Sequence, residues 1–340
     1  MILCLLSVVV VFASCTRDDN YQKKEDTPEY VEPATIDLGE YRTAHDIPGY
    51  KSYLDSIYAL FANRSISDRF YVWYLYADSY DRIGKDSLAI VYTDSAIQLL
   101  DNNPPSNFSR DNYLWAYYFK ADKELRRKNL DVAYKYYYKA LSMAEKYHDT
   151  CAIGYYDLKI GLIMFSTRQY KDASRYFVSA YDNCLTCERN FGYFYRTQEL
   201  LNDIGLCFER LSQYDSAILY YKRDIELLES NRENFPDQRK SHMELAIAIA
   251  KGNLGGAYAK AGMPDSAEQM FKESLSQEDY ILEEPTDAQF TRLKLAELYI
   301  GSGRLSEAKG LIDEIGEINN GQPDRNVSLR LDKVYWQYWD

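Results

Sequence analysis

The chain has few of the residues from which catalytic and metal sites are usually built. It contains only three histidines, His45, His148 and His242, and they stand in separate segments. No nucleophilic side chain has a base at a spacing diagnostic of a catalytic pair. The glycine-rich stretch GNLGG (252–256) lies within a predicted helix, so it is not a phosphate-binding loop. We therefore expect no enzymatic activity and no cofactor.

The chain also lacks an excess of basic residues and a long hydrophobic run. Its 40 Lys and Arg residues are outnumbered by 52 Asp and Glu residues, which gives a formal net charge of −12. Because binding of nucleic acid needs concentrated positive charge, we expect no nucleic acid partner. The apolar stretch at residues 2–14 is too short to cross a bilayer as a helix.

That short apolar stretch ends in VFASC, where small residues lead directly to Cys15. The ending resembles a bacterial lipobox, which implies that residues 1–14 are a lipoprotein signal peptide and that lipid is attached to Cys15. The resemblance also implies a membrane anchor in the cell envelope of a Gram-negative bacterium, with the outer membrane as the expected location. Phe12 stands where lipoboxes prefer leucine, and no Lys or Arg precedes the run. An ordinary secretory signal and a start upstream of Met1 are the alternatives.

Residues 15–48 are predicted to form a polar tether. They are rich in charged residues, show little periodicity and include three prolines. The pair Asp18 and Asp19 is similar to export signals that send some Gram-negative lipoproteins to the outer face of the outer membrane. A solvated linker is the alternative explanation of that pair.

One pattern occurs six times, a short turn segment that closes on an alanine. The segments are GKDSLA (84–89), KNLDVA (128–133), RQYKDA (168–173), SQYDSA (212–217), GMPDSA (262–267) and GRLSEA (303–308). Twelve positions before each alanine stands another small residue: Ala77, Ala121, Gly161, Gly205, Gly255 and Ala296. Such a pair lets two helices approach closely across a turn. The alanines are 44, 40, 44, 50 and 41 residues apart, a period that indicates a solenoid.

Residues 199–228 show the physical basis of one unit. Leu200, Ile204 and Leu211 belong to an apolar stripe with the 3.6-residue period of an amphipathic helix. After a turn, Asp215 occupies the predicted N-cap of a second helix with its own apolar stripe. Each unit is therefore a helical hairpin, which must stack on its neighbours to bury its apolar face.

The hairpins resemble tetratricopeptide repeats. An aromatic residue follows the first small residue by three positions in four units, at Tyr80, Phe208, Tyr258 and Tyr299. The second helices carry Tyr137, Phe177, Tyr221 and Phe271 at their aromatic position. The resemblance covers about residues 67–318 and implies an all-α, right-handed superhelical solenoid of about six hairpins. The intervals exceed the family's usual repeat, so we expect longer helices or loops.

We place the solenoid at residues 49–340. The predicted hairpins are 67–100, 111–147, 151–186, 197–229, 243–280 and 287–318. A helix over 49–64 is expected to precede them. The terminal helix at 327–340 is either a capping helix or the first helix of a truncated hairpin.

The resemblance implies a protein or peptide partner on the concave face, which first helices line in this family. The predicted groove residues are Tyr71, Tyr74, Asp78, Trp115, Tyr118, Asp122, Tyr155, Asn202 and Asn253. Rings would hold partner side chains, and the asparagines would pair with main-chain amides, as in peptide-binding members of the family. The alternatives are that the tyrosines belong to the core and that the asparagines bind nothing.

These observations favour a lipid-anchored, non-enzymatic scaffold. A truncated periplasmic sensor portion of a membrane-bound, repeat-containing transcription regulator is one alternative. An accessory lipoprotein for glycan or nutrient uptake is the other.

Four cysteines follow the polar tether: Cys151, Cys184, Cys187 and Cys207. Cys151 and Cys187 stand eighteen residues on either side of Gln169, the centre of a predicted turn, so antiparallel helices bring them together. A disulfide can form there outside the cytoplasm. A bridge within CLTC (184–187) and a zinc site completed by His148 are the alternatives, and we predict no metal. Cys207 is expected to be a buried free thiol.

Overall fold

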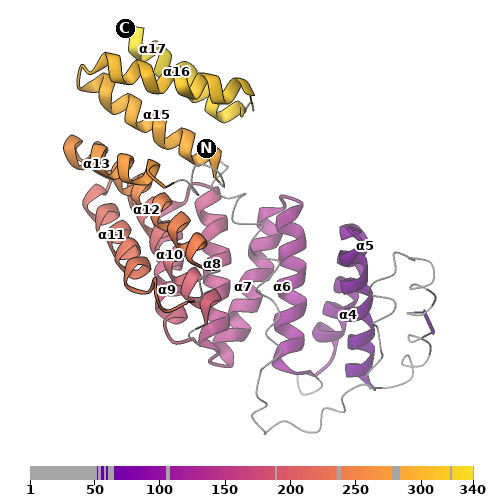
Figure 1. The fold of residues 1–340 in the computed structure, drawn as a ribbon. Helices are drawn as coiled ribbons and strands as arrows, with labels where there is room; N and C mark the ends of the chain where they lie inside the picture. Colours follow the sequence, from indigo (N-terminus) through magenta and orange to yellow (C-terminus); the bar gives the residue numbers. More distant parts are fainter. Residues whose placement is uncertain are drawn as a thin grey trace. The chain divides into compact units, whose positions relative to one another are not determined.

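The computed structural model of the protein describes residues 52, 55, 56, 59, 65–104, 108–187, 190–235, 239–277, 284–321 and 324–339. Within these residues it contains thirteen α-helices and no strand (Figure 1). The predicted all-α architecture of about six helical hairpins is therefore confirmed. The signal peptide, Cys15 and the polar tether lie outside the described residues and stay predictions. Of the helix expected over 49–64, four residues are described, and all four are helical.

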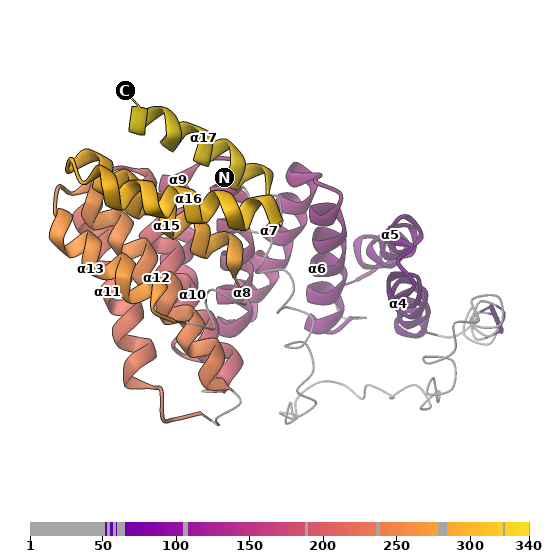
Figure 2. The ribbon, with the colours of Figure 1, turned by 45° about the horizontal axis from the view of Figure 1, so that its top comes forward.

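The first compact unit ends at Ile160. Its helices are α4 (Ile66–Arg82), α5 (Asp86–Asn102), α6 (Arg110–Arg126), α7 (Leu130–Lys146) and the N-terminal part of α8 (Thr150–Ser166). α4 packs against α5, α5 against α6 and α6 against α7. Figure 2 shows the close pairing of α4 with α5. The helices from α4 to α7 thus contact their neighbours in sequence, as stacked hairpins require.

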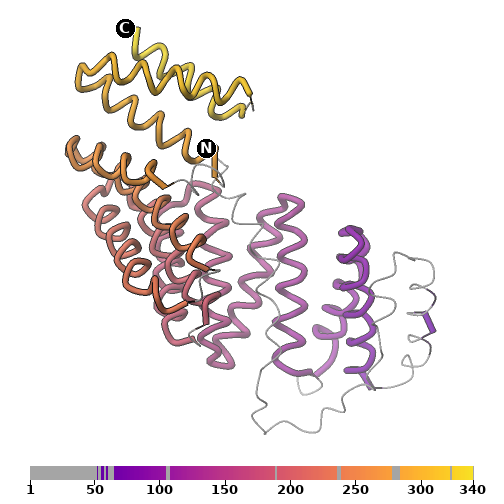
Figure 3. Tube along the Cα trace, viewed as in Figure 1, coloured from indigo at the N-terminus to yellow at the C-terminus, as the bar shows by residue number. Residues whose placement is uncertain are grey.

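The second compact unit begins at Gly161, within α8. Its further helices are α9 (Tyr170–Cys184), α10 (Phe191–Arg210), α11 (Tyr214–Ser230), α12 (Lys240–Lys260), α13 (Pro264–Leu275), α15 (Pro285–Gly301), α16 (Leu305–Gly321) and α17 (Arg325–Trp339). α10 packs between α9 and α11, and α12 between α11 and α13 (Figure 3). α15 contacts α13 and α16, and α17 lies on both α15 and α16. None of the helices in the described ranges combines the length and apolar character needed to cross a lipid bilayer.

All twelve small residues of the predicted pairs are buried, and none of the nine alanines among them has any exposed surface. In three hairpins the small residue of the first helix is glycine, and an aromatic ring of the second helix lies directly on it. A Cβ on Gly161 would come within 2.6 Å of the Phe177 ring, and one on Gly205 within 2.6 Å of the Tyr221 ring. A Cβ on Gly255 would come within 2.7 Å of the Phe271 ring. The fixed spacing of the small residues therefore serves close helix packing.

The six turns share one backbone conformation. The residue five positions before each closing alanine has a positive φ, between 59° and 76°. These residues are Gly84, Lys128, Arg168, Ser212, Gly262 and Gly303. The next amide donates a hydrogen bond of 2.8–2.9 Å to the carbonyl five residues earlier, as in a Schellman motif. One turn geometry therefore closes every hairpin.

The prediction that Asp215 is the N-cap of its helix is wrong. The N-cap of α11 is Gln213, and Asp215 lies in the first turn of that helix. The tight turn at Ser212 starts α11 at Tyr214, two residues earlier than capping by Asp215 would require. The carboxylate of Asp215 therefore acts on the partial positive charge of the helix N-terminus and not through a capping bond.

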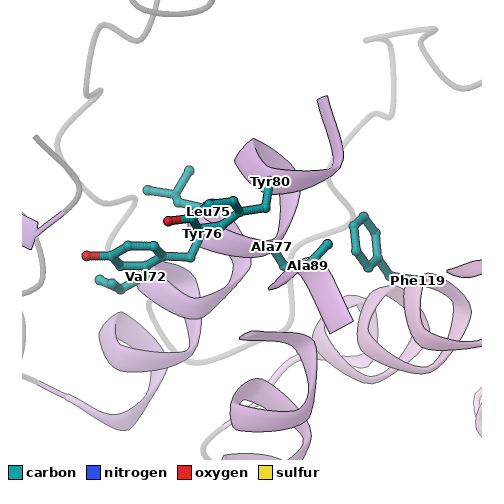
Figure 4. Close-up of a cluster of buried hydrophobic side chains, with 7 residues drawn as sticks. All are labelled: Val72, Leu75, Tyr76, Ala77, Tyr80, Ala89 and Phe119. Atoms are coloured by element: carbon teal, nitrogen blue, oxygen red, sulfur yellow. The ribbon is translucent and has the colours of Figure 1, made fainter. Parts of the chain in front are cut away.

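Aromatic rings build much of the core of the first unit. One cluster of buried residues comprises Val72, Leu75, Tyr76, Ala77, Tyr80, Ala89 and Phe119 (Figure 4). Tyr92 of α5 stacks on Tyr76 and Tyr80 of α4, with ring centroids 4.7 and 5.3 Å apart. Tyrosine is abundant in this chain, at 34 residues, in part because its ring fills such inter-helix space.

Candidate partner-binding surface

The first unit presents the same pattern on two successive first helices. α4 carries Tyr71, Tyr74 and Asp78, and α6 carries Trp115, Tyr118 and Asp122 forty-four positions later. In both helices the residues are spaced i, i+3 and i+7, which places them on one side of the helix. All six are half-buried. We refer to these six residues as the aromatic and acidic face.

The rings of this face contact one another across the two helices. Tyr71 and Tyr74 are stacked, with centroids 5.7 Å apart, and the Tyr74 ring meets that of Trp115 edge-on at 4.6 Å. Trp115 also lies 5.1 Å from Phe119 and 5.9 Å from Phe70, both of which are buried. The core therefore holds one side of the indole in place.

Tyr118 extends the face toward α8. Its ring lies 5.7 Å from that of Tyr155, and the hydroxyls of the two are hydrogen-bonded. Burial raises the pKa of Tyr118, and it raises the pKa of Tyr155 well above the usual range. Both phenols are therefore neutral at physiological pH and retain their hydroxyl protons. The Nζ of Lys159 lies 5.3 Å from the centre of the Tyr155 ring.

Each carboxylate of the face has an arginine one turn further along its helix. Asp78 pairs with Arg82 at 2.7 Å, and Asp122 pairs with Arg126 at 3.2 Å. The side chains of the arginines are 43% and 56% exposed, whereas those of the carboxylates are 23% and 18% exposed. Exposed pairs of this kind contribute little to stability. A cationic group of a partner can therefore replace the arginines at small cost.

The two predicted asparagines meet in the second unit. The Nδ2 of Asn253, on α12, donates a hydrogen bond of 3.0 Å to the Oδ1 of Asn202, on α10. Both side chains are half-buried. The bond leaves each side chain a second polar group, the Nδ2 of Asn202 and the Oδ1 of Asn253. One donor and one acceptor side by side suit the amide and carbonyl of a peptide main chain.

A shallow hollow in the second unit lies away from these residues. It is lined by Lys222, Ile225, Glu226, Glu229, Ser230, Lys251, Leu254, Met270 and Glu273. These residues come from α11, α12 and α13, and none of the predicted groove residues is among them. Lys251 bridges the hollow by an ion pair of 2.8 Å with Glu273.

A cluster of three acidic residues, of which Asp224 is buried, was not predicted from the sequence. Asp224 is 1% exposed, and no residue in the described part of the chain hydrogen-bonds its carboxylate oxygens. Desolvation, followed by repulsion from Asp203 and Glu199, raises the pKa of Asp224 well above its usual range. Desolvation and Glu199 raise the pKa of Asp203 to about 8. The available signal was Asp224 itself, which stands where the first three hairpins have alanine.

The cysteines separate into two kinds. Cys151 and Cys187, the predicted pair, are both disulfide-bonded. Cys184 and Cys207 are buried thiols, and burial raises the pKa of the Cys207 thiol. That Cys151 and Cys187 bond to one another stays a prediction. In the described ranges no group of His, Cys, Asp and Glu side chains has the arrangement of a metal site.

The stacked hairpins have the all-α solenoid fold of tetratricopeptide-repeat proteins. Three solved structures share the fold. The apo form of RapI is 14% identical, with a TM-score of 0.67 over 88% of this chain and 79% of that one. The apo form of the quorum sensor NprR from B. thuringiensis is 17% identical, with a TM-score of 0.55 over 85% of this chain and 75% of that one.

The third is a signal transduction ATPase with numerous domains, PH0952 from Pyrococcus horikoshii, which carries a tetratricopeptide repeat sensor. It is 16% identical, with a TM-score of 0.57 over 88% of this chain and 45% of that one. No family model matches the sequence, and no curated protein matches it. At these identities the likeness concerns the fold alone.

Proposed function

We propose that this protein is a non-enzymatic scaffold that binds an extended peptide or a protein segment along its first helices. The observation that carries the proposal is the aromatic and acidic face, which repeats one pattern on α4 and α6 with its rings in mutual contact. Half-buried rings give large contact area at low entropic cost. The Asn202 and Asn253 pair supports the same reading, because it offers one donor and one acceptor to a main chain.

The shared fold is consistent with this proposal. One structure with the fold is named a quorum sensor, and another has a tetratricopeptide repeat sensor. Both names contain the word sensor, which supports ligand recognition as the proposed role of the repeats. They also favour a sensor portion over a glycan-uptake accessory as the second candidate function.

The double variant Trp115→Ala, Tyr118→Ala tests the proposed face. A peptide selected against the full chain from a random display library should lose at least tenfold in affinity for this variant, measured by fluorescence polarisation. Tyr138→Ala is the matched control, because Tyr138 is 50% exposed on α7, a second helix. Undiminished binding would exclude the face. Unfolding of the double variant, seen by circular dichroism, would assign both rings to the core.

We further propose that the scaffold is anchored by lipid on Cys15 in a Gram-negative envelope. The support is the apolar segment that ends in VFASC. A Cys15→Ala variant should lose label from a fatty-acid probe and leave the membrane fraction. Cys207→Ala is the control, since Cys207 is buried. Unchanged labelling and partitioning of the Cys15 variant would contradict the anchor.

A further inference from the structure

The last described helix, α17, has one buried and one strongly exposed side. Val327, Leu331 and Val334 form a buried stripe that packs on α15 and α16. Leu329 and Trp336 lie on the opposite side, 61% and 73% exposed. Together with Trp339, at 74%, they are the most exposed large apolar side chains in the described part of the chain. We define the outer face of α17 as Arg325, Leu329, Asp332, Lys333 and Trp336.

The outer face is complementary to itself. Its five residues are separated along the chain by four, three, one and three positions. This spacing places them on one side of the helix. Suppose that two such helices lie antiparallel about a two-fold axis between Asp332 and Lys333. Leu329 of one copy then faces Trp336 of the other, and Asp332 faces Lys333. A two-fold interface needs this reciprocity, because residue i meets j and j meets i.

We propose that two copies of this chain associate through the outer faces of α17, antiparallel about a two-fold axis. The contact buries Leu329 and Trp336 and joins Asp332 to Lys333 twice. A lipid surface is a poorer occupant, because anionic headgroups would repel the carboxylate of Asp332 at the centre of the face. A single helix pair is smaller than a standard interface, so we expect micromolar association. The proposal is independent of the aromatic and acidic face.

Variants that reverse the charge of Asp332 or Lys333 test the proposed antiparallel alignment of the two α17 helices. Sedimentation equilibrium of the full chain over a concentration series should show a monomer and dimer equilibrium. Asp332→Lys and Lys333→Asp should each weaken the dimer at least tenfold, because like charges then meet at the axis. An equimolar mixture of the two variants should form heterodimers, since every facing pair is then opposite in charge. Asp265→Lys, at an exposed position of α13, is the control with the same charge change as Asp332→Lys and should leave the dimer unchanged.

The apolar part of the contact has a matched pair of variants. Leu329→Ser should weaken the dimer at least tenfold, whereas Leu219→Ser should not, because Leu219 is 47% exposed on α11. A wild-type chain that stays monomeric throughout the series would overturn the proposal. A dimer that tolerates Leu329→Ser, or mixed charge variants that remain monomeric, would also overturn it. Trp336-dependent binding of a monomer to phosphatidylglycerol vesicles would instead identify a membrane surface.

Discussion

At the scale of single residues, three hairpins match a glycine of the first helix to the aromatic ring that covers it. Gly161, Gly205 and Gly255 each lie under an aromatic ring at a distance that excludes a Cβ. Where the second helix has Ile312, the first helix has Ala296, and both are buried. The second hairpin has Ala121 together with the buried ring of Tyr137, so this matching does not hold in every hairpin.

Gly161→Ala tests this matching. We expect it to lower the free energy of unfolding by about 1–3 kcal/mol, because the new Cβ overlaps the Phe177 ring. In a Gly161→Ala, Phe177→Ile double variant the smaller side chain makes room for the methyl group. The double variant should therefore lose less stability than the sum of the single variants, with a coupling of about 1 kcal/mol or more. Urea unfolding of the wild type, the two single variants and the double variant gives the four free energies that the comparison needs.

The outcome of this cycle shows whether the Phe177 ring opposes the added methyl group. Additive losses would mean that the ring is not what opposes it. A Gly161→Ala variant as stable as the wild type would mean that the ring moves aside without cost.

Asp224 is the residue at which the fold departs most from its own pattern. Its carboxyl group has a raised pKa in the folded state, so it contributes stability below the unfolded pKa of about 4 and loses that contribution as pH rises. Asp224→Ala restores the alanine that three other hairpins have at this position. We expect this variant to be more stable than wild type by about 1–3 kcal/mol at pH 7, and this difference to shrink toward pH 4.

Thermal or urea unfolding at several pH values between 4 and 8 tests whether the stability advantage of Asp224→Ala grows as the pH rises. Asp224→Asn is the companion variant, because it removes the charge and keeps the polar side chain. Some pH dependence should persist in both variants, since the pKa of Asp203 is also raised, to about 8. A loss of stability in Asp224→Ala at pH 7 would contradict the account and point to a partner for the carboxylate.

At the scale of elements, the turn is the repeated unit of construction. Six residues in the left-handed backbone conformation close six hairpins with the same hydrogen bond, yet only three of these residues are glycine. Lys128, Arg168 and Ser212 carry a Cβ in a conformation that glycine adopts without steric cost. Exposure of these turns lets polar residues occupy them.

Arg168→Gly should therefore stabilise the chain. The left-handed conformation costs a residue with a Cβ about 1–2 kcal/mol, and the greater flexibility of unfolded glycine offsets part of this gain. We expect a net increase of about 0.5–1 kcal/mol in the free energy of unfolding. Gly303→Ala is the reverse test, because no atom lies within 4 Å of the added Cβ and only backbone strain opposes it. Thermal melts that move in the same direction for both variants would contradict the explanation.

At the scale of the whole molecule, covalent cross-linking adds to the stacking of hairpins. Cys151 and Cys187 are disulfide-bonded, and we predict that they bond to each other. Closing a loop of this length stabilises by roughly 3 kcal/mol, so reduction should lower the unfolding midpoint. Non-reducing peptide mapping should find the Cys151 peptide linked to the peptide that contains Cys187. A Cys184 linkage, or free thiols at all positions, would contradict the pairing.

The hairpin fold was determined by the sequence alone. The paired small residues and the apolar stripes are local patterns, and each hairpin joins segments that a short turn connects. Helix pairing therefore follows from spacing along the chain. That the residues of the aromatic and acidic face lie on one side of their helices was also predictable. A helix repeats every 3.6 residues, and the first helices of the first two hairpins carry these residues in the same register.

Only the tertiary structure decided what those residues contact. The bond between Asn202 and Asn253 joins positions fifty-one residues apart. The isolation of Asp224 depends on which helices surround it, and composition gives no hint of it. The exposure of Leu329 and Trp336 likewise depends on which side of α17 meets α15 and α16. Spacing fixes which side of a helix a residue occupies, but hydration and contact are set by neighbours that arrive from elsewhere in the chain.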